Sequence, residues 1–180
     1  MANRLVSATT LAVVSAVLAL GCAHVPSNSA VAERCIETAK HHDGDTFTCV
    51  LDGAPTGFVV RVASIDAPET GQAYWRGARS RLRELAAPGS SVDCYKVDRY
   101  ERRVCRLKTK EGLDAADLML SEGLAWYAED FANEDSPADR ERYRRLVAEA
   151  QAARRGLWAE PDPMLPKECR AHRRSGLTCR

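Results

Sequence analysis

The alternation of apolar and polar residues predicts a β-rich domain in the middle of the chain. Segments 46–51 (TFTCVL) and 57–65 (GFVVRVASI) are rich in apolar and β-branched residues, which favour strands. Segments 91–97 and 103–108 alternate and are joined by a short polar stretch, so they predict a hairpin. Pro68 ends the second run because its ring fixes φ and its nitrogen donates no hydrogen bond.

Apolar residues at three- and four-residue spacing predict a helix over 72–87, which Pro88-Gly89 stops. Further helices are predicted over 112–122 and 138–155, each ended by a glycine. Strands interrupted by one helix and followed by further helices favour an α+β fold. We expect a small five-stranded antiparallel β-barrel of the OB type, with about three helices packed beside it.

The N-terminal segment has the pattern of a bacterial export signal. Arg4 and the apolar run 11–20 are typical of a signal peptide over residues 1–21. The run ends in Leu-Ala-Leu-Gly before Cys22, which resembles a lipobox, so we expect Cys22 to be lipidated. The alternative is ordinary signal cleavage after Ala23, which discards that cysteine.

The remaining boundaries follow from composition. The expected parts are a small, polar tether (22–33), a globular domain (34–160) and a basic, Cys-containing C-terminal tail (161–180). With lipid on Cys22, we expect a monomer that is secreted across the cytoplasmic membrane and anchored in the envelope through this lipid. The expected place is the outer membrane or periplasm, with an extracellular location as the alternative.

The 7 cysteines are an odd number, which would leave one thiol unpaired in an oxidising compartment. If Cys22 carries lipid, pairing of sequence neighbours is the simplest scheme for the rest: Cys35–Cys49, Cys94–Cys105 and Cys169–Cys179. Cys94 and Cys105 flank the predicted hairpin, while other connectivities stay open. The sequence has no Cys-x-x-Cys pair, so we expect no zinc site.

The overall composition is that of a globular protein and does not point to a nucleic-acid ligand. Hydrophobic residues make up 45% and charged residues 28% of the chain, which excludes a disordered protein. Lys and Arg number 26 against 25 Asp and Glu, for a formal net charge of +1. Any binding of phosphates must therefore come from a local arrangement of basic side chains.

Three short segments concentrate charge: 43–46 (DGDT), 61–69 (RVASIDAPE) and 98–102 (DRYER). Each alone is typical of a polar turn exposed to solvent. The odd spacing from Arg61 to Asp66 places these side chains on opposite faces of a strand, unless a bulge reorients them.

Together the three segments contain what phosphodiester hydrolysis requires: a hard cation on oxygen ligands, a base, and donors for the charge on phosphorus. Asp45 and Asp66 are candidate ligands of Ca²⁺ or a similar ion, and Glu69 is the candidate base. Arg61 and Arg102 are candidates to clamp the phosphate, because the planar guanidinium offers bidentate hydrogen bonds.

The three segments also stand in the order of the three motifs of the staphylococcal nuclease (thermonuclease) family, which the chain resembles. Further matches are GLAW at 123–126, and AEAQA at 148–152 leading to GLW at 156–158. The resemblance covers about residues 35–158. It implies a metal-dependent endonuclease, usually with Ca²⁺, that cuts single- and double-stranded DNA and RNA and leaves 3′-phosphate ends.

The resemblance also implies a role for each matching residue. Asp45 and Asp66 would bind the cation through their carboxylates, and Ala67 through its main-chain carbonyl. Glu69 would orient or deprotonate the attacking water.

For the substrate, the resemblance implies that Arg61 holds the phosphate and its transition state. Arg102 would assist there and at the leaving group, and Tyr100 would shape the nucleotide pocket. Tyr127 is a further candidate for substrate binding: Tyr127 or Phe131 stacks on a base, or packs in the core.

Two features depart from the family pattern. Segment 70–72 is short and lacks the lysine-rich loop of the staphylococcal enzyme, and the tail 161–180 carries a basic cluster. That cluster either contacts phosphates or is solvated.

Two other functions stay open: a catalytically silent OB-type lipoprotein that binds nucleic acid or protein, and a structural envelope lipoprotein. The chain keeps all the acids and arginines of the motifs, which favours the enzyme.

Overall fold

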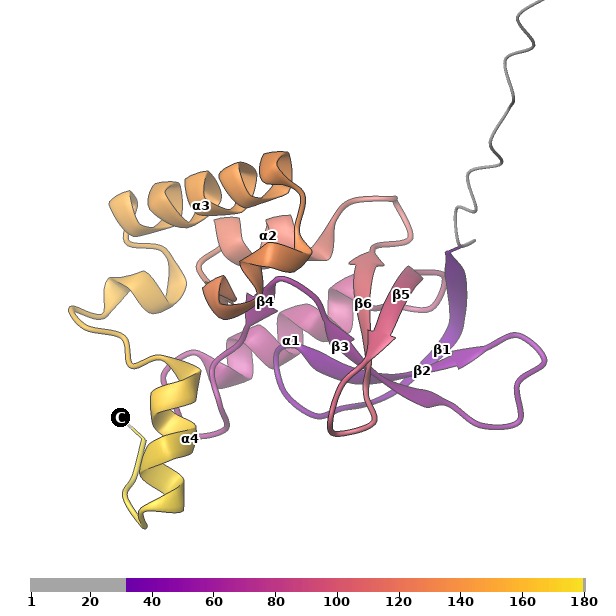
Figure 1. Ribbon diagram of the computed structural model, residues 1–180, viewed down its shortest axis with the longest axis horizontal. Coiled ribbons are helices and arrows are strands. Elements are labelled where there is room, and N and C mark those ends of the chain that lie inside the picture. The colour runs from indigo at the N-terminus through magenta and orange to yellow at the C-terminus, as the bar shows by residue number, and fades with distance from the viewer. Residues whose placement is uncertain (1–31, 180) are drawn as a thin grey trace, which may run out of the picture.

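A closed β-barrel forms the centre of the protein. The computed structural model describes residues 32–179, so the predicted signal peptide, Cys22 and most of the tether lie outside the described residues. Five strands close the barrel in the order β1-β2-β3-β6-β5 (Figure 1). They are β1 (Glu33–His41), β2 (Thr46–Leu51), β3 (Phe58–Val62), β5 (Ser91–Val97) and β6 (Arg103–Lys108). The expected α+β fold with an OB-type barrel is therefore confirmed.

One strand pairing in the barrel differs from the expected antiparallel arrangement. β3 and β6 pair in parallel, with Arg61 opposite Val104, whereas the other neighbours are antiparallel. The reason is geometric, because a closed ring with an odd number of strands cannot alternate direction all the way round.

Strand β1 has no counterpart in the sequence analysis. Its burial does not alternate, and register shifts next to Cys35 and His41 interrupt its pairing with β2. A strand with such bulges lacks the period-2 pattern by which strands are recognised.

The three predicted helices are present, each shorter than its pattern suggests: α1 (Trp75–Leu85), α2 (Ala115–Ser121) and α3 (Pro137–Ala152). Polar caps set two of the starts. The Asp114 carboxylate accepts hydrogen bonds from the first turn of α2, and Ser136 accepts one from the backbone N–H of Asp139 in α3. Tyr74, with a left-handed φ of 62°, precedes α1.

Shorter elements complete the chain: β4 (Ile65–Asp66), β7 (Trp126–Tyr127), the 3₁₀ turns η1 (Glu129–Glu134) and η2 (Gly156–Ala159), and α4 (Pro166–Arg174). β4 pairs with β7. Helix α4 was not expected, because a basic segment of nine residues shows no apolar stripe. Figure 1 shows α2 and α3 together beside the barrel, and α4 apart from them.

The core joins the barrel interior to α1 and α2. Its largest fully buried side chains include Phe47, Val60, Ile65, Leu82 and Met119. Beside it, the loops after α2 and α3 meet backbone to backbone: a Cβ on Gly123 would lie 2.2 Å from the carbonyl oxygen of Arg155. Only glycine fits this contact, which accounts for one of the sequence matches in this region.

Within residues 32–179 the cysteines pair as sequence neighbours, as the simplest scheme predicted. Cys35–Cys49 joins β1 to β2, Cys94–Cys105 joins β5 to β6, and Cys169–Cys179 ties the end of the chain to α4. Within residues 32–179, no helix has the length and apolar character needed to cross a membrane.

Buried His41 predicts that stability depends on pH. Burial, and then the positive charges of Arg83, Arg79 and His42, lower its pKa from 6.5 to about 4. The unfolded chain therefore takes up this proton at higher pH than the folded chain, and the unfolding free energy falls as pH drops from 6.5 towards 4. The loss is up to about 3 kcal/mol. Urea denaturation across this window should show a shallower pH dependence for His41→Gln; equal slopes would contradict the assignment.

Candidate active site

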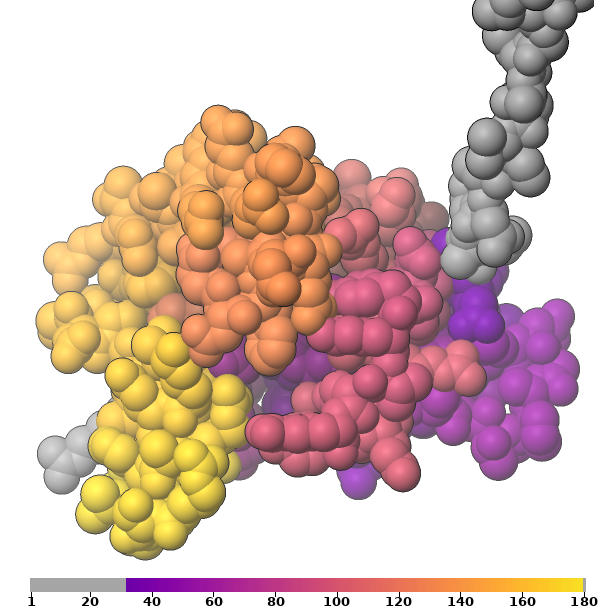
Figure 2. All heavy atoms as spheres, viewed as in Figure 1, coloured from indigo at the N-terminus to yellow at the C-terminus, as the bar shows by residue number. Residues whose placement is uncertain are grey.

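A wide cleft of about 1020 Å³ brings the predicted site residues together. Its lining includes the candidate acids and arginines: Asp45, Arg61, Asp66, Glu69 and Arg102. The β5–β6 hairpin, η1 and α4 also contribute residues to its walls. In Figure 2 the hollow is visible between the pink hairpin and the yellow C-terminal helix.

Asp45 is held in the turn between β1 and β2. Its side chain accepts hydrogen bonds from the Thr46 hydroxyl and from the backbone N–H of Ala67, both at 2.8 Å. Gly44 allows this approach, because a Cβ there would lie 2.7 Å from those of Ala67 and Ala78. The motif glycine thus lets the acidic turn pack against the segment after β4 and against α1.

Two carboxyl groups of this turn titrate in opposite directions. Burial raises the pKa of Asp45, but the charge of Arg61 and the hydrogen bonds from Ala67 and Thr46 outweigh it, and the pKa is lowered. Burial, and then the negative charge of Asp45, raise the pKa of Asp43. The pKa of Asp45 therefore lies below that of Asp43, so Asp45 is the first of the two to ionise as pH rises.

Arg61 connects the turn that holds Asp45 to Asp66 at the end of β4. Its Nε lies 3.5 Å from Asp45 Oδ1, and its Nη2 lies 3.6 Å from Asp66 Oδ1. The guanidinium also donates to the backbone carbonyl oxygens of Val62 and Ile65, the latter at 2.6 Å. Because the Arg61 side chain is only 15% exposed, its positive charge is stabilised by these partners and little by water.

A turn between β3 and β4 brings Arg61 and Asp66 to the same side. Ser64 at this turn has a left-handed φ of 65°, which breaks the strand alternation. Burial, and then the negative charge of Asp45, raise the pKa of Asp66, although Arg170 and Arg61 partly offset this. The odd spacing therefore does not separate the two side chains.

Arg102 faces the cleft from the β5–β6 turn. Asp98 accepts hydrogen bonds from the backbone N–H and from the Nε of Arg102, at 3.0 and 2.8 Å, and Arg102 Nη1 lies 3.4 Å from Thr46 Oγ1. The neighbouring Arg103 instead pairs with Glu33 and covers the Phe58 ring. The motif arginine at the site is thus Arg102.

The aromatic candidates are placed differently from one another. Tyr100 is 63% exposed on the hairpin, with Arg102 over its ring at 5.3 Å. Tyr127 also lines the cleft but is only 7% exposed, because its ring packs on Tyr143 and its hydroxyl donates to Asp135. Phe131, 54% exposed on the cleft wall, offers more ring surface for stacking.

One residue at the site was missed by the sequence analysis. Arg170 of α4 donates to the Glu69 carboxylate at 2.6 Å and to both Asp66 oxygens at 3.1 and 3.3 Å. It lies 104 residues from Asp66 in a tail where several basic residues cluster. Nothing in that cluster distinguishes Arg170 from its neighbours, so no sequence pattern could have identified it.

The oxygen donors of the site suit a hard divalent cation. Asp45 and Asp66 are close enough for the charge of one to raise the pKa of the other, and a cation between them would relieve this repulsion. Across residues 32–179, no three His, Cys, Asp or Glu side chains are grouped as a metal site. Side chains alone would therefore not fill a coordination sphere here, and the Ala67 carbonyl, water or substrate oxygens would complete it.

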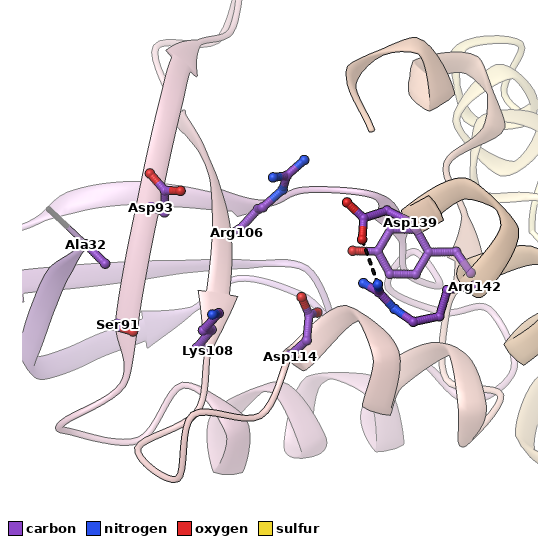
Figure 3. Close-up of a pocket in the computed structure, with 9 residues that line it drawn as sticks. Ala32, Ser91, Asp93, Arg106, Lys108, Asp114, Asp139 and Arg142 are labelled. Atoms are coloured by element: carbon purple, nitrogen blue, oxygen red, sulfur yellow. Dashed lines mark ion pairs between the residues drawn. The ribbon is translucent and has the colours of Figure 1, made fainter. Parts of the chain in front are cut away.

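A second, smaller cavity of about 340 Å³ lies between β5, β6 and the helices α2 and α3 (Figure 3). Several of its charged residues are already paired: Arg142 contacts Asp139 at 2.6 Å and Asp117 at 2.9 Å. The Asp114 carboxylate caps α2. The paired side chains around this cavity therefore form a structural ion-pair network.

Comparison with known proteins places the chain among nucleases. A family model described as "Staphylococcal nuclease homologue" matches residues 59–160. An uncharacterized endonuclease of Escherichia coli O157:H7 is 32% identical over 125 residues, covering 69% of this chain and 76% of that protein. An uncharacterized endonuclease of Haemophilus influenzae is 29% identical over 172 residues, covering 94% and 87%. A micrococcal nuclease of Shigella flexneri is 32% identical over 139 residues, covering 72% and 76%.

The contacts of Arg61 predict a structural cost that Arg102 does not share. Arg61→Ala should lower the unfolding free energy by about 3 kcal/mol, because it leaves the buried Asp45 carboxylate, the half-buried Asp66 carboxylate and two carbonyl oxygens without their partner. Arg102→Ala, which breaks a more exposed pair, should cost about 1 kcal/mol or less. Chemical denaturation of both variants tests this difference. Equal losses would show that Arg61 does not hold the site together.

Proposed function

The chain belongs to the staphylococcal nuclease family, and we propose that it is a calcium-dependent endonuclease that hydrolyses DNA or RNA and leaves 3′-phosphate ends. The observation that carries this proposal is the contact of half-buried Arg61 with both Asp45 and Asp66, beside Glu69 and Arg102. Two acids for a cation, a third acid and two arginines then face one cleft.

The acids divide into ligands and base. Asp45, Asp66 and the Ala67 carbonyl would hold the cation, which when bound supplies positive charge against the phosphate. Glu69 follows the Pro68 turn, where its backbone N–H donates to the Gln72 side chain at 2.7 Å. From this fixed position the Glu69 carboxylate accepts a proton from the attacking water.

The arginines stabilise the charge that develops on phosphorus. Arg61 is oriented before substrate arrives, because its backbone carbonyl partners belong to its own turn. Arg102 is held by Asp98 within the hairpin and reaches the cleft next to Thr46. Preoriented donors cost little reorganisation in the transition state, which is how such groups accelerate phosphoryl chemistry.

The cleft walls suit nucleic acid with unpaired bases. Tyr100 and Phe131 both line the cleft with exposed rings, and base stacking on such rings is tolerant of sequence. Tyr127 is buried in the cleft wall, where contacts with Tyr143 and Asp135 hold its ring in place. The proposed substrate class is therefore single-stranded DNA or RNA, or duplexes that open locally.

We further propose export and lipid anchoring through Cys22, with the monomeric enzyme at the outer membrane or in the periplasm. The support is the export-like pattern of residues 1–21 together with the three disulfides, which persist in oxidising compartments. Mass spectrometry of the membrane fraction tests for a diacylglyceryl group on Cys22; an unmodified chain in the soluble fraction would contradict it.

The first functional prediction concerns the cation. Labelled single-stranded DNA and RNA should be cut in Ca²⁺, remain intact with chelator, and carry 3′-phosphates that block extension by a polymerase. Mg²⁺ serves as the comparison ion. Retention of the DNA without cutting in either ion would favour the silent binding protein.

The second functional prediction concerns Glu69. Glu69→Gln should lower kcat by about 100-fold or more, because the amide cannot accept the proton. The fold and Ca²⁺ binding should persist. Glu129→Gln is the matched control, since Glu129 lines the same cleft but pairs with Arg144. Near wild-type turnover by Glu69→Gln would remove Glu69 from the role of base.

A further inference from the structure

The C-terminal helix α4 is fastened to the edge of the catalytic cleft. It lies beyond residues 59–160, the part that the family model matches. Just before it, the Met164 carbonyl accepts a hydrogen bond from the Gln72 side chain at 2.7 Å, and within it Arg173 donates to the Thr70 carbonyl. Buried Cys169 closes a disulfide with Cys179. Helix α4 therefore docks on the short loop after Glu69.

This docking places the positively charged guanidinium of Arg170 on two acids of the proposed active site, Asp66 and Glu69. Arg170 Nη1 is 2.6 Å from Glu69 Oε1, while Nη2 and Nη1 lie 3.1 and 3.3 Å from the two Asp66 oxygens. Arg173 adds a weaker ion pair with Glu69 at 3.6 Å. The Arg170 guanidinium thus occupies lone pairs that a divalent cation and an attacking water would need.

We propose that α4 is an autoinhibitory element, in which Arg170 competes with the divalent cation for Asp66 and blocks the Glu69 carboxylate. The inference rests on the proposed function, because it concerns the same acids. Cation binding and the Arg170 contact exclude each other, so each weakens the other by the same factor. Release of Arg170 frees the base at the moment when the cation arrives.

The expected change in Ca²⁺ affinity corresponds to the loss of one competing charge-assisted contact, that of Arg170. Arg170→Gln should bind Ca²⁺ about 10-fold more tightly than the wild type, since the acids no longer have to give up the guanidinium. Arg174→Gln is the matched control, because Arg174 is exposed on the same helix and does not line the cleft. Arg170 itself is 42% exposed, so its replacement leaves the core untouched.

The experiment measures Ca²⁺ binding to the purified, disulfide-intact protein by calorimetry without nucleic acid, and hydrogen exchange of residues 166–174 with and without Ca²⁺. We expect tighter binding for Arg170→Gln alone, and faster exchange of wild-type α4 when Ca²⁺ is added. Equal or weaker binding by Arg170→Gln would overturn the proposal. A higher KM for nucleic acid with unchanged Ca²⁺ affinity would also overturn it, and would make Arg170 a phosphate contact.

Cleavage by the same samples separates this inference from the proposed function. A wild type that cuts in Ca²⁺, with an Arg170→Gln variant of unchanged Ca²⁺ affinity, leaves the nuclease in place and rejects only the inhibitory role. Failure of both proteins to cut in any cation rejects the nuclease itself.

Discussion

The active-site cleft depends on one half-buried guanidinium, that of Arg61, which connects its acids to the barrel. Arg61 lies in a barrel strand, yet its side chain contacts two carboxylates and two backbone carbonyl oxygens. A charge in this position is tolerated only because each partner is fixed in place. The β1–β2 turn, the β3–β4 turn and the close approach at Gly44 supply this fixation. The fold and the chemistry therefore share the same contacts.

Around Arg61, acidic and basic groups from distant parts of the chain balance one another. The acids come from the turn after β1, from the end of β4 and from the turn that follows it, while Arg102 lies on a hairpin and Arg170 on the last helix. Each arginine is oriented by a local partner or by a docked element, and none relies on the overall charge of +1. The arginines that a nucleic-acid ligand would contact thus lie in the same cleft as the acids, and each is already oriented there.

The elements with regular patterns were predictable from the sequence, and the irregular ones were not. Strands 46–51, 91–97 and 103–108 match their predicted bounds because alternation and flanking turns are clear. β1 was missed because its bulges break the period, and Ser64 reorients Asp66 through a turn that spacing cannot reveal. The motif residues were found by resemblance. Arg170 was not, because tertiary docking alone selects it from a basic tail.

The disulfide pattern has a consequence for biosynthesis. Each bridge joins cysteines that follow one another among the bridged residues, with separations of 14, 11 and 10 residues. A chain that enters an oxidising compartment with its N-terminus first presents each pair together before the next one arrives. Oxidation in order of arrival then gives the native connectivity without reshuffling, and the bridge beside Arg170 closes last. In a chain that is oxidised in this order, the Cys169–Cys179 bridge at α4 forms after the two bridges that join barrel strands.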